Sequence, residues 1–137
     1  MSKDNITDIH APAIDPEELA AMETEAEKTK AKVEAAGGKI GMYVHKFETP
    51  LIYDGNPIKE LTFDFDSLTG QDVFDIDNEL EALGVNVAVR ELNGHFQLTY
   101  CVKACKENVG VDIFALMRVP DFLAISRQVK TFLLLAK

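Results

Sequence analysis

Several features that would direct a function prediction are scarce in this sequence. The 137 residues include no tryptophan and only two cysteines. No apolar run reaches the roughly 18 residues needed to cross a bilayer, so we expect no membrane segment. Basic residues number 14 against 23 acidic ones, which gives a formal net charge of −9. Because binding to a polyanion requires clustered lysine and arginine, this balance argues against a nucleic-acid partner.

The N-terminus carries no apolar segment of the kind that a secretory signal requires. With Cys101 and Cys105 as the only cysteines, this absence predicts a protein of the reducing cytoplasm. A length of 137 residues and a hydrophobic content of 47% suit one ordinary domain with its own core.

Motifs for catalysis and metal binding are missing as well. The sequence holds no GxSxG, no HExxH and no phosphate-binding loop. Cys101 and Cys105 lack the second ligand pair of a structural zinc site, so they are predicted to be buried helical cysteines. The acidic residues between 64 and 81 do not follow the calcium-loop template. With His45 and His95 interpreted as surface or strand-face residues, we predict no enzymatic activity, no cofactor and no metal.

The strongest structural signal is a β-hairpin over residues 49–66. Asp54-Gly55 is typical of a two-residue hairpin turn, because glycine reaches positive φ without a side-chain clash. The predicted strands cover 42–53 and 58–65. Their apolar residues alternate with polar ones and so define one buried face: Phe47, Leu51 and Tyr53 on the first arm, and Leu61, Phe63 and Phe65 on the second.

Helical periodicity dominates the rest of the chain. A capping box at Thr69–Asp72 begins a predicted helix that ends at Gly84. Further helices are predicted over 95–107, over a short segment at 111–117, and from Pro120 onward, whereas 85–91 suits a strand or a helix equally. The 70–83 helix and the last helix are the expected covers of the hairpin. The face predicted to be buried on the 70–83 helix consists of Val73, Ile76, Leu80 and Leu83.

The last helix ends in three consecutive leucines, Leu133, Leu134 and Leu135. Three neighbouring residues cannot all face one core, so at least one of them is expected to be exposed in a monomer. Core packing is the preferred interpretation for Leu133, and a homo-oligomer contact remains open for the others.

The N-terminal part differs from the rest in composition. Residues 1–14 are predicted to be a flexible arm, followed by a helix from Asp15-Pro16 to residue 36 that stops at Gly37-Gly38. This helix is acidic and has a thin apolar stripe, so it is either a solvated helix loosely attached to the domain or a docking helix for a partner. The stripe consists of Leu19, Met22, Ala26, Val33 and Ala36.

These patterns predict an α+β fold in which an N-terminal β-hairpin packs against a small helical bundle, preceded by a flexible acidic helical arm. The predicted boundary separates an arm over 1–38 from a hairpin-plus-helices domain over 39–137. If a partner binds, apolar residues on the arm helix and at the C-terminal end are the candidates to contact it: Leu19, Met22, Val33, Leu134 and Leu135.

The order of features over residues 45–135 resembles the phage tail assembly chaperones, a family of small proteins from contractile-tailed and related phages. The matching segments are a hairpin, a helix start and a final helix, and residues 1–44 have no counterpart. The residues that carry the resemblance are Thr49-Pro50-Leu51-Ile52, Asp54-Gly55, Ile58-Lys59-Glu60-Leu61-Thr62-Phe63, Ser67-Leu68-Thr69-Gly70-Gln71-Asp72, Pro120-Asp121-Phe122, Val129 and Phe132-Leu133.

The resemblance implies a chaperone that binds the tape measure protein, keeps its long helical chain soluble and assists assembly of the tail tube. The tail tube protein is a further candidate partner. Such a protein works in the host cytoplasm and is absent from the mature virion, and the family has no catalytic residue to carry over. The alternatives are a structural tail or baseplate component retained in the virion, and a small regulatory binding module unrelated to phages.

Overall fold

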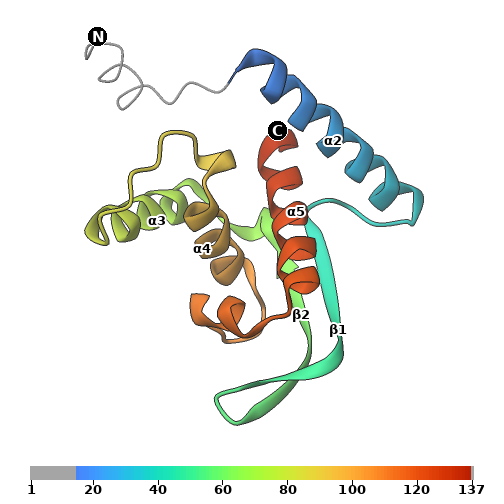
Figure 1. Cartoon of the computed structure of the whole chain (residues 1–137), viewed down its shortest axis with the longest axis vertical. Coiled ribbons are helices and arrows are strands. Elements are labelled where there is room, and N and C mark those ends of the chain that lie inside the picture. The colour runs from blue at the N-terminus through green and yellow to red at the C-terminus, as the bar shows by residue number, and fades with distance from the viewer. Residues whose placement is uncertain (1–14, 137) are drawn as a thin grey trace.

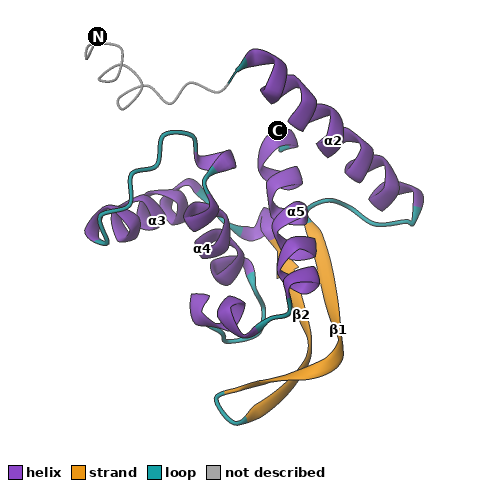
Figure 2. Ribbon diagram, viewed as in Figure 1, coloured by secondary structure: helices purple, strands orange, loops and turns teal. Residues whose placement is uncertain are grey.

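The computed structural model of the chain describes residues 15–136 and confirms the predicted α+β fold (Figure 1). The prediction for residues 1–14 lies outside the described residues. Three short 3₁₀ helices, Phe65–Ser67, Arg90–Leu92 and Val111–Leu116, connect the longer elements (Figure 2). Those longer elements are α2 (Pro16–Ala35), β1 (Met42–Tyr53), β2 (Asn56–Asp64), α3 (Gly70–Ala82), α4 (Gly94–Ala104) and α5 (Val119–Leu135).

β1 and β2 form the expected antiparallel hairpin around Asp54-Gly55. Both turn residues have positive φ, 50° and 77°, as a type I′ turn requires. The register shifts between the pairs Lys46–Glu60 and Leu51–Ile58. Residues 47–50 of β1 therefore stand opposite a single residue of β2, and this irregularity accommodates a proline, which cannot donate to the ladder.

The apolar face of the hairpin forms the centre of the core. Leu61, Phe63 and Phe65 are completely or almost completely buried. The ring of Phe65 lies 5.6 Å from that of Phe63, 5.8 Å from that of Phe132 on α5 and 6.4 Å from that of Tyr100 on α4 (centroid distances). The Tyr100 hydroxyl donates a 2.6 Å hydrogen bond to the buried carbonyl of Phe65, so the aromatic cluster is also tied through the backbone.

The hairpin is covered by α4 and α5, whereas α3 packs chiefly on α4 (Figure 1). The expectation that the 70–83 helix is a main cover of the hairpin was therefore wrong. The short chain between β2 and α3 carries α3 past the hairpin edge, and α4 occupies the position in between. α3 still contributes two buried residues, Ile76 and Leu80, to the common core.

The beginning of α3 is as predicted, but its last apolar residue is not. The backbone N–H of Thr69 donates to the Asp72 carboxylate at 2.8 Å, in accordance with the expected capping box. Leu83, predicted to be buried, is 76% exposed. At Gly84 the chain turns with φ 78°, the N–H of Val85 donates to the Leu80 carbonyl, and Val85 packs against the core instead.

The ambiguous segment 85–91 is neither a strand nor a long helix. It is a loop whose end is held by Arg90, which makes a 2.7 Å ion pair with Asp77 of α3. Hydrogen bonding from this guanidinium lowers the pKa of the Asp77 carboxyl. α4 ends at Ala104, earlier than expected, because the next residues pair with the outer edge of β2: the Lys106 N–H donates to the Thr62 carbonyl.

We expect Phe65→Ala to lower the free energy of unfolding by about 3–5 kcal/mol, because it empties the centre of the aromatic cluster. Phe74→Ala is the matched control, since Phe74 is 61% exposed on α3 and its loss should change stability by less than about 0.5 kcal/mol. Urea denaturation of both variants measures the difference. Equal losses would show that Phe65 is not the packing centre.

The stability of the fold at alkaline pH should depend on the Tyr100 hydroxyl. Burial raises the pKa of Tyr100 to about 12, above the about 10 of an unfolded tyrosine. The stabilisation linked to this shift is therefore complete below pH 10 and is lost as the pH rises toward 12. Tyr100→Phe should be less stable at neutral pH but should lose less stability between pH 10 and 12. Urea denaturation gives the free energy of unfolding at each pH. If it falls equally with pH in wild type and Tyr100→Phe, the link between stability and the Tyr100 hydroxyl is contradicted.

Candidate functional site

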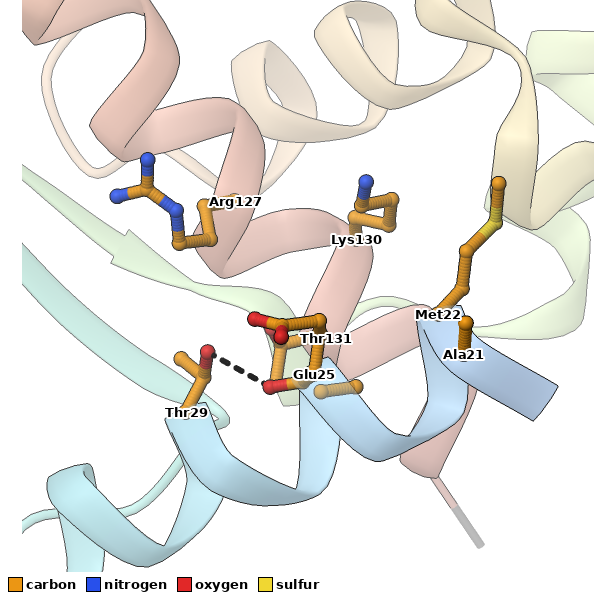
Figure 3. A pocket seen from close by; sticks show the side chains of 8 residues that line it. Ala21, Met22, Glu25, Thr29, Arg127, Lys130 and Thr131 are labelled. Atoms are coloured by element: carbon orange, nitrogen blue, oxygen red, sulfur yellow. Dashed lines mark hydrogen bonds between the residues drawn. The ribbon is translucent and has the colours of Figure 1, made fainter. Parts of the chain in front are cut away.

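The most extensive helix–helix contact of the described chain joins α2 to α5 (Figure 1). A hollow of about 260 Å³ remains between them. Figure 3 shows Met22, Glu25 and Thr29 of α2 facing Arg127 and Lys130 of α5 across this hollow. The site thus combines an apolar floor with two cationic side chains.

The sequence of α2 accounts for both its helical form and its shallow contact. The Asp15 carboxylate accepts from the Glu17 N–H at 2.9 Å and caps the first turn, where Pro16 suits the helix start. At the other end, Gly37 has φ 85° and the Gly38 N–H donates to the Val33 carbonyl. Between these caps the apolar stripe consists mostly of small or isolated side chains, so α2 can approach α5 closely but fills little volume.

Among the residues of α2, Ala26 alone is buried, at 4% exposure. The three larger apolar residues predicted as partner-binding on this helix, Leu19, Met22 and Val33, are half-buried. Met22 lines the hollow. The part of the stripe around Met22 and Ala26 thus faces α5 of the same chain, a contact that the sequence did not reveal, whereas Ala36 is exposed.

The leucines at the end of α5 are all partly covered. Leu133, Leu134 and Leu135 are each half-buried, so the expectation that at least one is exposed was wrong. The reason is that α2 lies over this end of α5, while Leu133 packs against the core on the other side. Leu135 borders a second hollow of about 570 Å³ whose walls include Lys30 of α2.

A polar chain inside the fold was not foreseen from the sequence. His45, interpreted as a surface or strand-face residue, is only 7% exposed. Its Nε2 lies 2.8 Å from the Asp121 carboxylate in the first turn of α5, and its Nδ1 lies 2.8 Å from the Tyr43 hydroxyl. In the tautomer that carries its proton on Nε2, Nε2–H donates to Asp121 and Nδ1 accepts from the Tyr43 hydroxyl.

This Tyr43–His45–Asp121 chain joins the hairpin to the last helix. Burial, together with the nearby Asp121 carboxylate, raises the pKa of the Tyr43 hydroxyl and keeps it protonated as a donor. Asp121 also lies where the helix dipole favours a negative charge. Each polar group therefore has a partner, and the arrangement suits a structural connection. Only the alternation that places residue 45 on the inner face of β1 could have indicated it.

The two cysteines lie in different surroundings at the end of α4. Cys101 is buried in α4, while Cys105 follows that helix and lies 3.4 Å from the Glu107 carboxylate. Burial raises the pKa of Cys101, and it raises that of Cys105 to about 12, so both remain thiols. Across residues 15–136, no three histidine, cysteine or acidic side chains are grouped as a metal site.

No helix in the part of the chain that the structure describes is long and apolar enough to cross a membrane. Comparison with known protein families, curated proteins and solved structures finds no match for this chain.

We expect Asp121→Ala to destabilise the fold by about 1–3 kcal/mol, because it leaves the buried Nε2–H of His45 without an acceptor. Asp121→Asn is the matched control: it removes the same charge but keeps an oxygen that can accept this hydrogen bond. Thermal and urea unfolding should rank wild type above Asn and Asn above Ala. Equal stability of the two variants would mean that the charge, and not the hydrogen bond, is what matters.

Proposed function

We propose that this protein is a phage tail assembly chaperone that binds the tape measure protein and assists assembly of the tail tube around it. The observation that carries the proposal is the apolar surface at the α2–α5 contact, where Met22 and Leu135 border hollows instead of packing tightly. A protein that holds a helical client needs such incompletely buried apolar surface.

Two further features support this proposal. The net charge of −9 keeps protein molecules apart while they hold an aggregation-prone client. The motif residues that resemble the chaperone family lie mainly in the hairpin and in α5, where Leu61, Phe63 and Val129 are buried. These residues build the scaffold, which leaves the α2–α5 surface, Leu134 and Leu135 for the client. The protein then acts in the host cytoplasm and leaves before the virion is mature, with the tail tube protein as a further candidate partner.

Co-expression with the tape measure protein should increase the soluble fraction of that protein, measured by quantitative gel analysis of cleared lysates. Leu134→Asp should reduce this effect more than it lowers the melting temperature of the domain, since Leu134 is half-buried at the proposed surface. Leu83→Asp is the matched control, because Leu83 is 76% exposed at the residue directly after α3, away from that surface.

Equal solubility of the tape measure protein with and without this chain would contradict the proposal. A collapse of the fold in Leu134→Asp would instead show that Leu134 belongs to the core. Mass spectrometry of purified particles distinguishes the chaperone from a structural tail or baseplate component: stoichiometric amounts in the virion would favour the structural role.

A further inference from the structure

The contact of α2 with α5 is long but shallow. Of its 20 residues only Ala26 is buried, and alanine contributes the smallest apolar side chain that a contact can bury. Beside Ala26 lies the hollow of about 260 Å³ lined by Met22 and Thr131. A well-packed helix pair fills such space with larger side chains. The contact between α2 and α5 therefore falls short of the packing that α5 could support.

The uncovered surface continues along α5 beyond α2. A third hollow, of about 180 Å³, is lined by Leu123, Ser126 and Gln97, and it shares Arg127 and Lys130 with the hollow of about 260 Å³. Leu123 is 49% exposed. The outer face of α5 thus presents one band in which Arg127 and Lys130 border both hollows and Leu123 lies at the far end, and α2 covers only part of it.

The charges on the two helices are complementary but unpaired. The first 12 residues of α2 contain five glutamates and no lysine or arginine. Within residues 15–136, neither Arg127 nor Lys130 has an ion-pair partner, although Glu25 lines the same hollow. The band is thus suited to an acidic helix, but the glutamates of α2 form no ion pair with Arg127 or Lys130.

The connection to β1 allows α2 to leave without disturbing the core. Gly37 has φ 85°, a conformation that other residues rarely adopt, and Gly38 follows it. The buried cluster of the hairpin and of α3, α4 and α5 contains no residue of α2. Displacement of α2 would therefore expose the outer band of α5 and leave that cluster in place.

We propose that the outer face of α5 is a binding site for an acidic amphipathic helix of another protein, and that this helix takes the place of α2. A partner helix with larger apolar side chains fills the hollow that Ala26 and its neighbours leave and presents its carboxylates to Arg127 and Lys130. α2 then acts as a weak internal substitute that covers the site until the partner arrives. This inference rests on the proposed function, in which the partner helix belongs to the tape measure protein.

A partner of different sequence fits this site better than the α2 of a second copy does. The α2 of a second copy makes the same contacts as the chain's own α2. The chain's own helix is tethered by a short linker, so its effective concentration is on the order of millimolar and it outcompetes a free copy. Only a helix with better contacts can displace it, and the unfilled hollow is where better contacts are available.

The test uses a fluorescent synthetic peptide with the sequence of residues 15–38 carrying Ala21→Leu, which adds a larger apolar side chain at the hollow. Its affinity is measured by anisotropy for the full chain and for two variants. Ala26→Lys places a charge at the buried contact, close to Arg127, and should release α2. Ala31→Lys is the matched control, since Ala31 is exposed on the same helix.

We expect the peptide to bind Ala26→Lys at least tenfold more tightly than the wild-type chain, and Ala31→Lys to behave as wild type. Equal affinity of all three chains would overturn the proposal, because the peptide would then bind beside α2 or elsewhere. In the Ala26→Lys background, Arg127→Glu with Lys130→Glu should weaken binding at least tenfold. Unchanged binding would overturn the assignment of the band.

Two controls keep the result interpretable. Near-ultraviolet circular dichroism must show that the core of Ala26→Lys is folded, and if it is not, Met22→Lys at the edge of the same hollow replaces it. Sedimentation of Ala26→Lys should show a monomer. A dimer that excludes the peptide would identify a second copy as the occupant and overturn the proposal.

Competition with the tape measure protein separates this inference from the proposed function. Displacement of the peptide by tape measure fragments supports both. A peptide that discriminates between the variants but is not displaced supports the site and contradicts the tape measure protein as its occupant. Rescue of tape measure solubility without any discrimination by the peptide overturns the site and leaves the chaperone function intact.

Discussion

Burial of the inner face of the hairpin is the interaction on which the rest of the structure depends. A two-stranded sheet has little stability of its own, and this one is stabilised because α4 and α5 bring aromatic rings against Phe65 from two directions. The Tyr100 hydroxyl bonds to the Phe65 carbonyl in the same place, so the cluster is also joined to the backbone. At the same end of the hairpin but on the other strand, the Tyr43–His45–Asp121 chain connects β1 to α5 and fixes the position of the last helix.

The elements that could be predicted best from the sequence were those specified by residues close together in the chain. Asp54-Gly55 placed the turn, and the capping residues placed the starts of α2 and α3, because each depends on neighbours a few residues apart. The prediction that Leu83 is buried was wrong, and the reason is also local. Periodicity continued one residue past the helix, but Gly84 redirected the chain and passed the buried position to Val85.

The candidate site was harder to predict because it depends on how distant segments meet. The stripe of α2 was visible in the sequence, but nothing in it indicated that α5 would be the surface facing it, or that a hollow would remain between them. The connection from His45 to Asp121 spans 76 residues and has no local pattern. Alternation could place residue 45 on the inner face of the strand, but its partner follows only from the packed structure.

The distance in sequence between the hairpin and α5 has a kinetic consequence. A hairpin forms in microseconds, whereas bringing Asp121 to His45 requires closing a loop of 76 residues, which carries a larger entropic cost. Until that closure, the ring of Phe65 lacks the aromatic contact that α5 supplies through Phe132. A chain in which the hairpin forms before α5 docks therefore exposes an apolar strand pair, the kind of surface that is prone to self-association.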